Sequence, residues 1–302
     1  MSPTSDENAE ALAARTAHEA SIKRNPHPDF KSVEDSRPDW VEKSAWHYTK
    51  THQPGWQWGD GGNDGGASLE RQHVEIDPHA PGRPPTFNYK LLISAIVPRP
   101  IGFLSTVSAD GTSSNLAPFS YTNMVNHDPP VFAIGISGGL ATAKDTLANI
   151  ASSRECVLNI ISEHFIEAAN STSVNAPYGT SEWALSGLHK APSTFVKPAR
   201  VKEAVFSVEC KLMELREFDS RAQPGKKSGT LVLLEGVNFW AREDAINEDK
   251  NMIDPSVLRP VSRLGGITYG RTLEGFELLR PNFSSVNEAG NSKDLLEEAS
   301  KP

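Results

Sequence analysis

Residues in the middle of the chain have the types and spacing needed to bind an anion. Lys144 and Thr146 lie near the expected start of a helix, so an ammonium group and a hydroxyl would flank the unpaired N–H groups of its first turn. This arrangement suits a phosphate monoester, although an ordinary capped helix with Lys144 in solvent also accounts for these residues. Arg99 lies between two prolines and could supply a second cation, or it could be a surface charge.

A proline inside a strand-like run indicates a second candidate binding surface. Residues 98–121 contain two expected strands joined by the tripeptide Ala-Asp-Gly at 109–111, a turn signal that favours positive φ at Gly111. Pro118 lies in the second strand and cannot donate to a ladder, so that strand is expected at an edge or a bulge. Asn115 and Ser120 flank this proline, where free backbone amides could meet the heteroatom edge of a planar ring.

The motifs of several other enzyme classes are missing from the sequence. The glycine-containing segments at 135–139 and 225–228 lack the spacing of a dinucleotide fingerprint and of a Walker A loop. The histidines form no H-E-x-x-H or zinc-finger spacing, and no G-x-S-x-G elbow is present. The sequence therefore predicts neither a Rossmann domain nor a metal site nor a nucleophilic triad.

The elements that must position the candidate residues are mostly strands. We expect helices at 88–96, at 163–172, and from an N-cap at Thr142, with Asp145 three residues later. Strands are expected at 131–137, 155–162, 205–218 and 229–243, the last two joined as an antiparallel hairpin. This pattern predicts a mainly β protein, a β-barrel with a few covering helices, rather than a parallel α/β sheet.

Composition divides the chain into three expected parts. Residues 1–85 form an N-terminal extension that is partly disordered, residues 86–280 form the folded domain, and residues 281–302 form a solvated tail. Within the extension, residues 1–22 are expected to be disordered or weakly helical. Residues 23–66 are aperiodic but rich in aromatics, namely Phe30, Trp40, Trp46, Tyr48, Trp56 and Trp58. These rings would pack on the chain's own domain or on a partner subunit, or they would be scattered on a loose tail.

Charge and hydropathy exclude several kinds of partner. The formal net charge of −8 argues against nucleic-acid binding, which requires a cationic surface. No apolar run approaches the roughly 20 residues that span a bilayer, and no leader peptide is evident, so a cytoplasmic location is the default expectation. Cys156 and Cys210 lie far apart in apolar strand-like runs and are expected to be buried free thiols.

The order of short motifs resembles one known family. The motifs PRPI, FLSTV, SADG, SNLAPFSYTN, DPPVFAIGI, KDTLANI, ECVLNII and VSRLGG follow one another across roughly residues 89–279. In this order they resemble the flavin reductase-like, FMN-binding split-barrel family. The resemblance implies a six-stranded Greek-key antiparallel barrel, usually a homodimer, with one FMN per subunit near the dimer interface.

The same resemblance implies a set of cofactor-binding residues. Ser105 and Thr106 would lie beside the flavin and its phosphate side, and the NLAPFS segment would run along the isoalloxazine edge. The KDT triplet would help to hold the phosphate, while the arginine of RLGG would approach from a late loop. With Arg99 added from the residue chemistry, the expected cofactor-binding residues are Arg99, Ser105, Thr106, Asn115, Leu116, Ala117, Pro118, Ser120, Asn123, Lys144, Asp145, Thr146 and Arg263.

The leading functional hypothesis is an FMN-dependent oxidoreductase. Its simplest form is an NAD(P)H:flavin reductase, in which hydride passes from NADH or NADPH to flavin and no general acid or base is required. Catalytic residues are therefore not assigned. One alternative is an FMN-binding electron-transfer module that works with an electron-accepting protein partner. Another is a split-barrel binding protein that has lost its cofactor and uses the aromatic arm for assembly.

Overall fold

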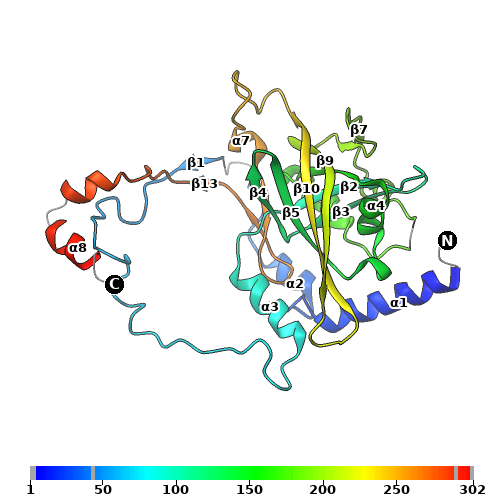
Figure 1. Ribbon diagram of the computed structural model, residues 1–302, viewed down its shortest axis with the longest axis horizontal. Coiled ribbons are helices and arrows are strands. Elements are labelled where there is room, and N and C mark those ends of the chain that lie inside the picture. Colours follow the sequence, from blue (N-terminus) through cyan, green and yellow to red (C-terminus); the bar gives the residue numbers. More distant parts are fainter. Residues whose placement is uncertain (1–4, 42–44, 178, 289–291, 300–302) are drawn as a thin grey trace. The chain divides into compact units, whose positions relative to one another are not determined.

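The computed structural model describes residues 5–41, 45–177, 179–288 and 292–299 (Figure 1). The chain forms two compact units. The first contains residues 1–41 and 84–272, and the second contains residues 42–83 and 273–302. Composition predicts boundaries at 85/86 and 280/281. The compact units are defined by contacts instead, so these boundaries stay predictions.

The first unit is built on one antiparallel sheet. Its hydrogen-bonded order is β3-β2-β6-β9-β10-β5-β4, and each neighbouring pair is antiparallel. The strands are β2 (Gly102–Val107), β3 (Ser114–Phe119), β4 (Thr122–His127), β5 (Pro130–Ser137), β6 (Glu155–Ile160), β9 (Phe206–Asp219) and β10 (Lys227–Ala241). The long ribbon of β9 and β10 is drawn in yellow-green to yellow in Figure 1 and confirms the hairpin expected at 205–218 and 229–243.

A sharp corner closes this sheet into a barrel. Only Ser120 and Tyr121 separate β3 from β4, so the two are halves of one bent strand, of which one pairs with β2 and the other with β5. Counted in this way, the barrel has the six strands that the resemblance implies. The Gly135 N–H donates to the Tyr121 carbonyl at 2.7 Å, and a Cβ at Gly135 would lie 3.0 Å from Tyr121 Cβ. The absence of a side chain at Gly135 therefore lets the corner approach β5 closely.

Two apolar cores lie on opposite sides of the barrel wall. The inner core includes Leu104, Ile134 and Leu234 and is completed by Leu147 and Ile150 from α4 (Asp145–Ser153). The outer core includes Phe103 and Leu116 and is covered by α5 (Ile166–Ser171) and α6 (Glu182–Ser186). Full burial of one such side chain contributes about 1.5–3 kcal/mol, so Leu147 and Ile150 both help to hold α4 against the sheet.

The start of α4 differs from the sequence expectation. The prediction of Thr142 as its N-cap is wrong, because Leu140–Thr142 form a separate 3-10 turn and Lys144 is the N-cap. Ala143 and Lys144 have extended backbones, with ψ of 137° and 163°, which interrupt the helical path. The helix expected at 88–96 is confirmed as α3 (Pro85–Ala95), and the one expected at 163–172 is split into the 3-10 turn Glu163–Phe165 and α5.

Short elements complete the first unit. They are β7 (Lys190–Ala191) with β8 (Arg200–Val201), α7 (Pro255–Leu258), and the hairpin of β11 (Val261–Arg263) with β12 (Tyr269–Arg271).

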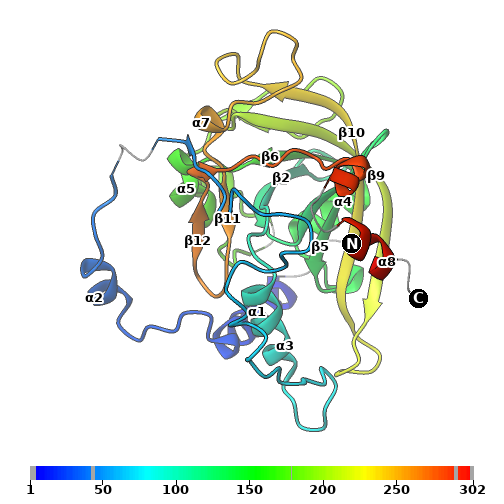
Figure 2. The ribbon, with the colours of Figure 1, turned by 90° about the vertical axis from the view of Figure 1, so that its left-hand side faces the viewer.

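The N-terminal segment packs on the first unit. Helix α1 (Ser5–Ile22) lies beside α3 in both ribbon views (Figures 1 and 2), and Ile22 at its end is buried. Arg24 Nε donates to the Tyr89 hydroxyl of α3 at 2.8 Å. After α2 (Phe30–Asp35), Trp40 Nε1 donates to Glu163 Oε1 at 2.9 Å. This part of the aromatic arm therefore contacts the chain's own domain.

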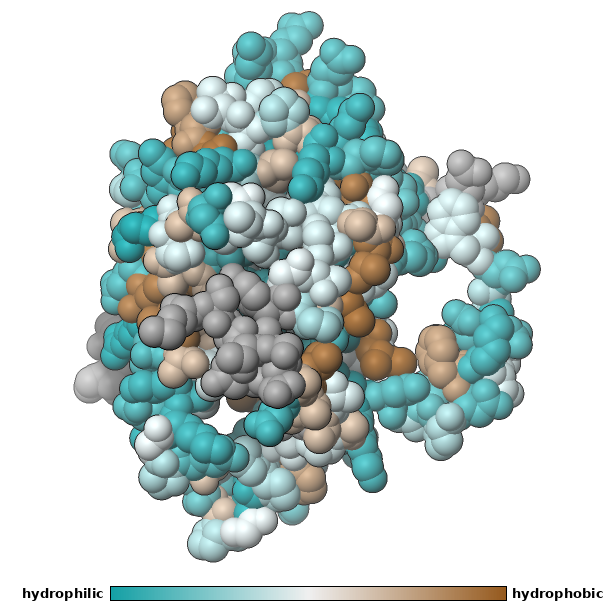
Figure 3. All heavy atoms as spheres, turned by 90° about the vertical axis from the view of Figure 1, so that its right-hand side faces the viewer, coloured by the Kyte–Doolittle hydropathy of each residue, from teal (hydrophilic) through white to brown (hydrophobic). Residues whose placement is uncertain are grey.

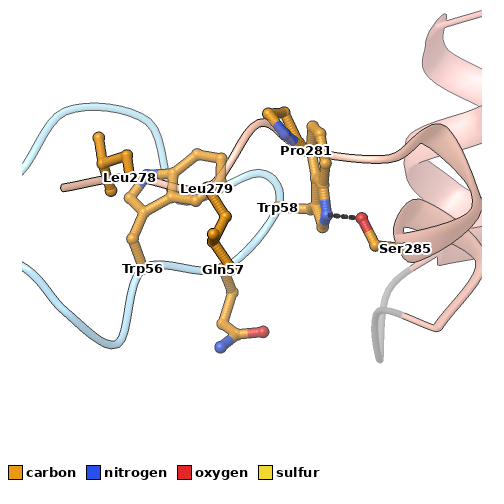
Figure 4. Close-up of a pocket in the computed structure, with 7 residues that line it drawn as sticks. All are labelled: Trp56, Gln57, Trp58, Leu278, Leu279, Pro281 and Ser285. Carbon is orange, nitrogen blue, oxygen red and sulfur yellow. Dashed lines mark hydrogen bonds between the residues drawn. The ribbon is translucent and has the colours of Figure 1, made fainter. Parts of the chain in front are cut away.

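The second unit combines residues 42–83 with the C-terminal segment that begins at residue 273. Strand β1 (His47–Tyr48) pairs in parallel with β13 (Glu274–Gly275), and a Cβ at Gly275 would lie 2.6 Å from the Trp46 ring. Trp56 and Trp58 line an open hollow of about 640 Å³ with residues 278–285, where Trp58 Nε1 donates to Ser285 Oγ at 3.3 Å (Figure 4). The segment expected to be a solvated tail contains the 3-10 turns Phe283–Glu288 and the helix α8 (Ser292–Ala299).

The face drawn in Figure 3 is mostly hydrophilic, with apolar side chains reaching it in separate patches. Within the described residues, the structure contains no helix that is both long enough and apolar enough to cross a membrane.

Candidate functional site

Polar groups from β3 and α4 meet where α4 begins. Lys144 is the N-cap of α4, but its side chain does not cap the helix, and Thr146 in the first turn is buried. Asn115 of β3, also buried, lies 2.6 Å from Thr146 Oγ1 through its amide. Residues 31 positions apart in the sequence are thus joined at one place, which we call the α4 site: Asn115, Lys144, Asp145 and Thr146.

The Asn115 amide links the α4 site to a third element. With its nitrogen toward Thr146 the amide makes one bond, whereas rotation by 180° lets its oxygen accept from Thr146 Oγ1 at 2.6 Å. The nitrogen then donates to the two Glu182 carboxylate oxygens, at 2.9 and 3.2 Å. The rotated orientation satisfies both ends of the amide. Asn115 therefore connects α4 to Glu182 at the start of α6.

The outer edge of β3 faces away from β2. The Leu116 N–H donates to Glu182 Oε2 at 3.2 Å, so it points outward rather than toward Ser105, its partner in register. Pro118 has the same parity along the strand, and its nitrogen, which carries no hydrogen, must also point outward. Since β3 is terminal in the hydrogen-bonded order, the prediction that Pro118 lies on an edge strand is confirmed. Between Leu116 and Pro118 this edge offers carbonyl acceptors and one N–H that Glu182 already holds.

Ser105 and Thr106 lie on β2 with their side chains buried. The Ser105 hydroxyl donates to the Ala199 carbonyl, and Thr106 Oγ1 accepts from Asn149 Nδ2 of α4 at 3.1 Å. Thr106 is opposite Asn115 in register. Thr106 therefore belongs to the surroundings of the α4 site, whereas the Ser105 hydroxyl is directed at a loop carbonyl.

The segment before α6 contacts Lys144 and Asp145 of the α4 site. Lys144 Nζ donates to Asn175 Oδ1 at 3.2 Å, and the Gly179 N–H donates to Asp145 Oδ2 at 3.2 Å. Nearby, Ser181 Oγ lies 3.4 Å from Ser114 Oγ of β3. Asn175, Gly179 and Ser181 thus lie against α4 or β3 at the places where ligand contacts are expected.

The two arginines form a separate group. Arg99 and Arg263 pair through their backbones, with N···O distances of 3.1 and 2.9 Å. Arg99 is 8% exposed, and its guanidinium donates to the carbonyls of Ile93, Ile96 and Leu264. These bonds fasten the end of α3 to the loop after β11. Of its three nitrogens, Nε is buried without a partner among the described residues.

Arg263 is directed at its own loop. Its guanidinium donates to the Gly266 and Ile267 carbonyls at 2.9 and 3.2 Å and lies 4.3 Å from the centre of the Tyr269 ring. Thr106 is seven positions after Arg99, which corresponds to roughly 23 Å at the usual strand rise. The arginine pair and the α4 site therefore lie at opposite ends of β2.

The remaining expected residues lie along β3 and around the corner. Leu116 is buried in the outer core, Ala117 and Pro118 are half-buried, and Ser120 is half-buried at the corner itself. Asn123 is exposed on β4, opposite Ala133. The structure thus gathers Thr106, Asn115 and the KDT triplet into one place, and it leaves Asn123, Arg99 and Arg263 outside that place.

Glu182 is the group that sequence reasoning missed. Burial raises the pKa of its carboxyl, backbone hydrogen bonds at Glu182 and Leu116 lower it, and the nearby Asp145 carboxylate raises it, with a net upward direction. In the sequence it is an acidic residue at the start of a five-residue helix, which is a common pattern without function. Only the approach of α6 to β3 gives it a role.

Comparisons with known proteins agree on one family. Residues 94–258, more than half of the chain, match the sequence profile described as "Flavin reductase like domain". An uncharacterised protein of Aquifex aeolicus is 39% identical over 183 residues, which cover 60% of this chain and 88% of that protein. The uncharacterised protein YwrF of Bacillus subtilis is 35% identical over 194 residues, with 64% and 93% covered.

Two solved structures are similar along most of their length. Nitrilotriacetate monooxygenase component B from Bacillus cereus superposes with a TM-score of 0.64 at 31% identity, covering 69% of this chain and 100% of that chain. The Pseudomonas fluorescens 2-nitrobenzoate 2-nitroreductase NbaA gives 0.60 at 29% identity, covering 70% and 98%. By its barrel, its motifs and these matches, the chain belongs to the flavin reductase-like family.

Proposed function

We propose that this chain binds FMN and is an oxidoreductase, most simply an NAD(P)H-dependent flavin reductase. The observation that carries the proposal is the α4 site, where Lys144, Thr146 and Asn115 meet beside the outer edge of β3. Membership of the flavin reductase-like family supports the assignment of flavin to this place.

The donor set at the α4 site fits a phosphate monoester. It combines an ammonium group at Lys144, a hydroxyl at Thr146, and the first turn of a helix whose N-cap side chain leaves it uncapped. The outer edge of β3 adds the carbonyls of Leu116 and Pro118, which suit an N–H donor on a planar heterocycle such as isoalloxazine. Asp145 and Glu182 are the features that fit less well, because two carboxylates stand near the anion.

In this arrangement the chain's residues bind and orient. Lys144, Thr146 and the α4 amides would hold the phosphate, and β3 from Asn115 to Ser120 would lie along the ring. Bound FMN would supply the hydride-accepting chemistry, with NADH or NADPH as the co-substrate. The inner-core residues of α4 keep the phosphate-binding turn fixed against β2, which limits the entropy lost on binding.

A steady-state assay tests the reductase proposal. Purified protein supplied with FMN is expected to oxidise NADH or NADPH well above the rate without protein. The absorbance spectrum of the protein after gel filtration shows in the same experiment whether flavin stays bound. Failure to exceed the uncatalysed rate with both nucleotides would rule out the reductase activity.

An electron-transfer role with a protein partner is the second candidate. It is favoured by the similarity to a protein whose name describes it as component B of a monooxygenase. Under this alternative, flavin stays bound through gel filtration but turns over slowly until an electron-accepting protein is added. Rapid turnover with free flavin alone would exclude it.

We also infer that the chain acts as a homodimer through α3 and β4. All α3 residues are described and only Ile93 is buried, while Leu91 and Leu92 are exposed. Strand β4 is terminal in the sheet order and exposes Met124 and Val125. Apolar side chains on an uncovered strand edge are typical of association sites.

The dimer is tested by light scattering after gel filtration. Val125→Glu and Leu92→Glu are each expected to shift the dimer toward monomer, whereas Met252→Glu, at an exposed loop residue, should not. A wild-type protein that stays monomeric at high micromolar concentration would contradict the inference.

A further inference from the structure

A buried carboxylate stands beside the proposed phosphate site. Glu182 is 5% exposed, and its oxygens accept from the Leu116 N–H at 3.2 Å and from the rotated Asn115 amide at 2.9 and 3.2 Å. Asn115 alone stands between Glu182 and Thr146 in the first turn of α4, and it is hydrogen-bonded to both. A change in the charge of Glu182 therefore changes the electrostatic potential at the place where the phosphate would bind.

The charges around Glu182 are mixed. The elements packed against it carry Asp145 and Lys144 at the start of α4, and Lys190 of β7 lies 5.4 Å from the ring of the adjacent Trp183. Strand β3 contributes only uncharged groups here, Asn115 and Leu116. Burial and the Asp145 carboxylate both raise the pKa of Glu182, so this carboxyl takes up a proton more readily than an exposed glutamate.

A bound phosphate would add to this effect. A phosphate monoester brings a charge of about −1.5 to −2 near neutral pH. Placed at the α4 site, it would be a third anionic group beside Asp145 and Glu182, with Lys144 as the cation opposing them. Of the two carboxyls, Glu182 is the more buried one, so its charged form is the less favourable of the two. Protonation of Glu182 therefore removes the repulsion at a smaller cost in free energy than protonation of Asp145.

We propose that Glu182 couples the binding of the flavin phosphate to the uptake of a proton. The inference rests on the proposed function, since it assumes FMN at the α4 site. In its ionised form, Glu182 positions the edge of β3 by accepting the Leu116 N–H. Its protonation controls the affinity of the site for the phosphate. Affinity for FMN is then highest at acidic pH and falls as pH rises.

The sign follows from linkage. Binding raises the pKa of Glu182 further, so the advantage of the protonated form is complete below the pKa of the free protein. It is lost as pH rises through the pKa of the complex. Each unit by which binding raises the pKa corresponds to a tenfold fall in affinity across this window.

The test measures the dissociation constant of FMN between pH 5 and pH 8 for the wild type and Glu182→Gln. The second ionisation of the phosphate itself affects both proteins alike, so the informative quantity is the ratio of their dissociation constants. This ratio, wild type over variant, is expected to rise about tenfold or more with pH. Riboflavin, which lacks the phosphate, should show a constant ratio, and Glu167→Gln, at an exposed α5 residue, should follow the wild type.

Calorimetry of the wild type gives a readout that needs no variant. Titrations of FMN and of riboflavin in buffers of different ionisation enthalpy report the protons taken up on binding, and FMN should take up more than riboflavin. Parallel pH profiles for wild type and Glu182→Gln, or equal proton uptake for the two flavins, would overturn the coupling while leaving FMN binding intact. Absence of flavin binding at every pH would overturn the proposed function itself, and this inference with it.

Discussion

Cys156 of β6 and Cys210 of β9 lie directly opposite each other in the antiparallel pair, and both side chains are fully buried. They are separated by more than fifty residues in the sequence, and only the register of the barrel makes them neighbours. Both are free thiols in the inner core beside Leu158 and Val208, as expected from their apolar surroundings. Their chemistry is therefore governed by burial and by each other.

The first prediction concerns the reactivity of these thiols. The hydrogen bond with Cys210 raises the pKa of the Cys156 thiol, and burial raises it further. Because the thiolate is the reactive form, neither cysteine should react with Ellman's reagent in native buffer within an hour, and both should react at once in guanidinium. Rapid labelling of either thiol in the native protein would show that the inner core opens at this point.

The second prediction concerns acid stability and rests on Glu209 of β9. Burial acts to raise the pKa of this carboxyl, but hydrogen bonds from Trp240, from the Thr194 and Phe195 amides and from Asn238 outweigh burial and bring the pKa to about 2. The stabilisation is present above the unfolded-state pKa and is lost as pH falls from about 4.5 toward 2. A shift of this size corresponds to at most about 3 kcal/mol.

Urea unfolding at pH 7, 4 and 2.5 checks this prediction. Glu209→Gln should lower the free energy of unfolding at pH 7 and flatten its decline between pH 4 and 2.5. Glu214→Gln, at an exposed residue of the same strand, should keep the wild-type profile. An unchanged acid transition in Glu209→Gln would mean that other carboxyls control it.

The barrel strands could be predicted because their signals are local. Alternation in the segments that became β9 and β10, and the Asp-Gly turn before β3, need only neighbouring residues. The edge position of Pro118 could also be predicted, because a residue without an N–H cannot donate to a neighbouring strand. By contrast, the start of α4 was misplaced because Thr142 offers a good local cap, while the extended backbone of Ala143 and Lys144 moves the N-cap two residues on, to Lys144.

The candidate site could be predicted only in part, because its contacts cross the fold. Asn115 and Thr146 were expected at one site from the resemblance, yet their bond depends on α4 packing against β2 and β3. Glu182 has no signal in its own segment. Arg99 was expected to face a ligand, and the structure instead turns it toward the carbonyls at the end of α3, which no spacing in the sequence indicates.

The third prediction tests the proposed phosphate contacts. Lys144→Ala combined with Thr146→Ala should weaken FMN binding by about 1–3 kcal/mol, because each replaced group would form a hydrogen bond with a charged phosphate. Fluorescence quenching of flavin measures the dissociation constant. Lys144 is exposed, so Lys144→Ala alone should leave the unfolding free energy nearly unchanged, whereas Thr146→Ala removes a buried partner of Asn115 and should lower it.

Lys202→Ala is the matched control for the loss of a positive charge, because Lys202 is also an exposed lysine of the first unit. Its flavin affinity should equal that of the wild type. Unchanged affinity in the Lys144 and Thr146 double variant would show that the phosphate binds elsewhere.

The fourth prediction concerns the contact between the N-terminal segment and the loop that carries Arg263. Gly266 in this loop has φ of +59°, and a Cβ there would lie 3.0 Å from the Arg24 backbone oxygen. Gly266→Ala should therefore cost about 1 kcal/mol for the left-handed backbone and a further amount of about 1 kcal/mol for the close contact. The displaced segment should also be cleaved faster by trypsin near Lys23 and Arg24.

Gly225→Ala separates these two costs. Gly225 has φ of +81° in the turn between β9 and β10, and nothing lies within 4 Å of a Cβ placed there. This variant carries the backbone cost alone, so its loss in unfolding free energy should be smaller and its cleavage at Lys23 and Arg24 unchanged. Equal losses and equal cleavage in the two variants would contradict the contact. A larger effect at Gly266 would establish that the N-terminal segment holds the loop of Arg263 in place. Arg24 of this segment precedes the family-matched region by about seventy residues.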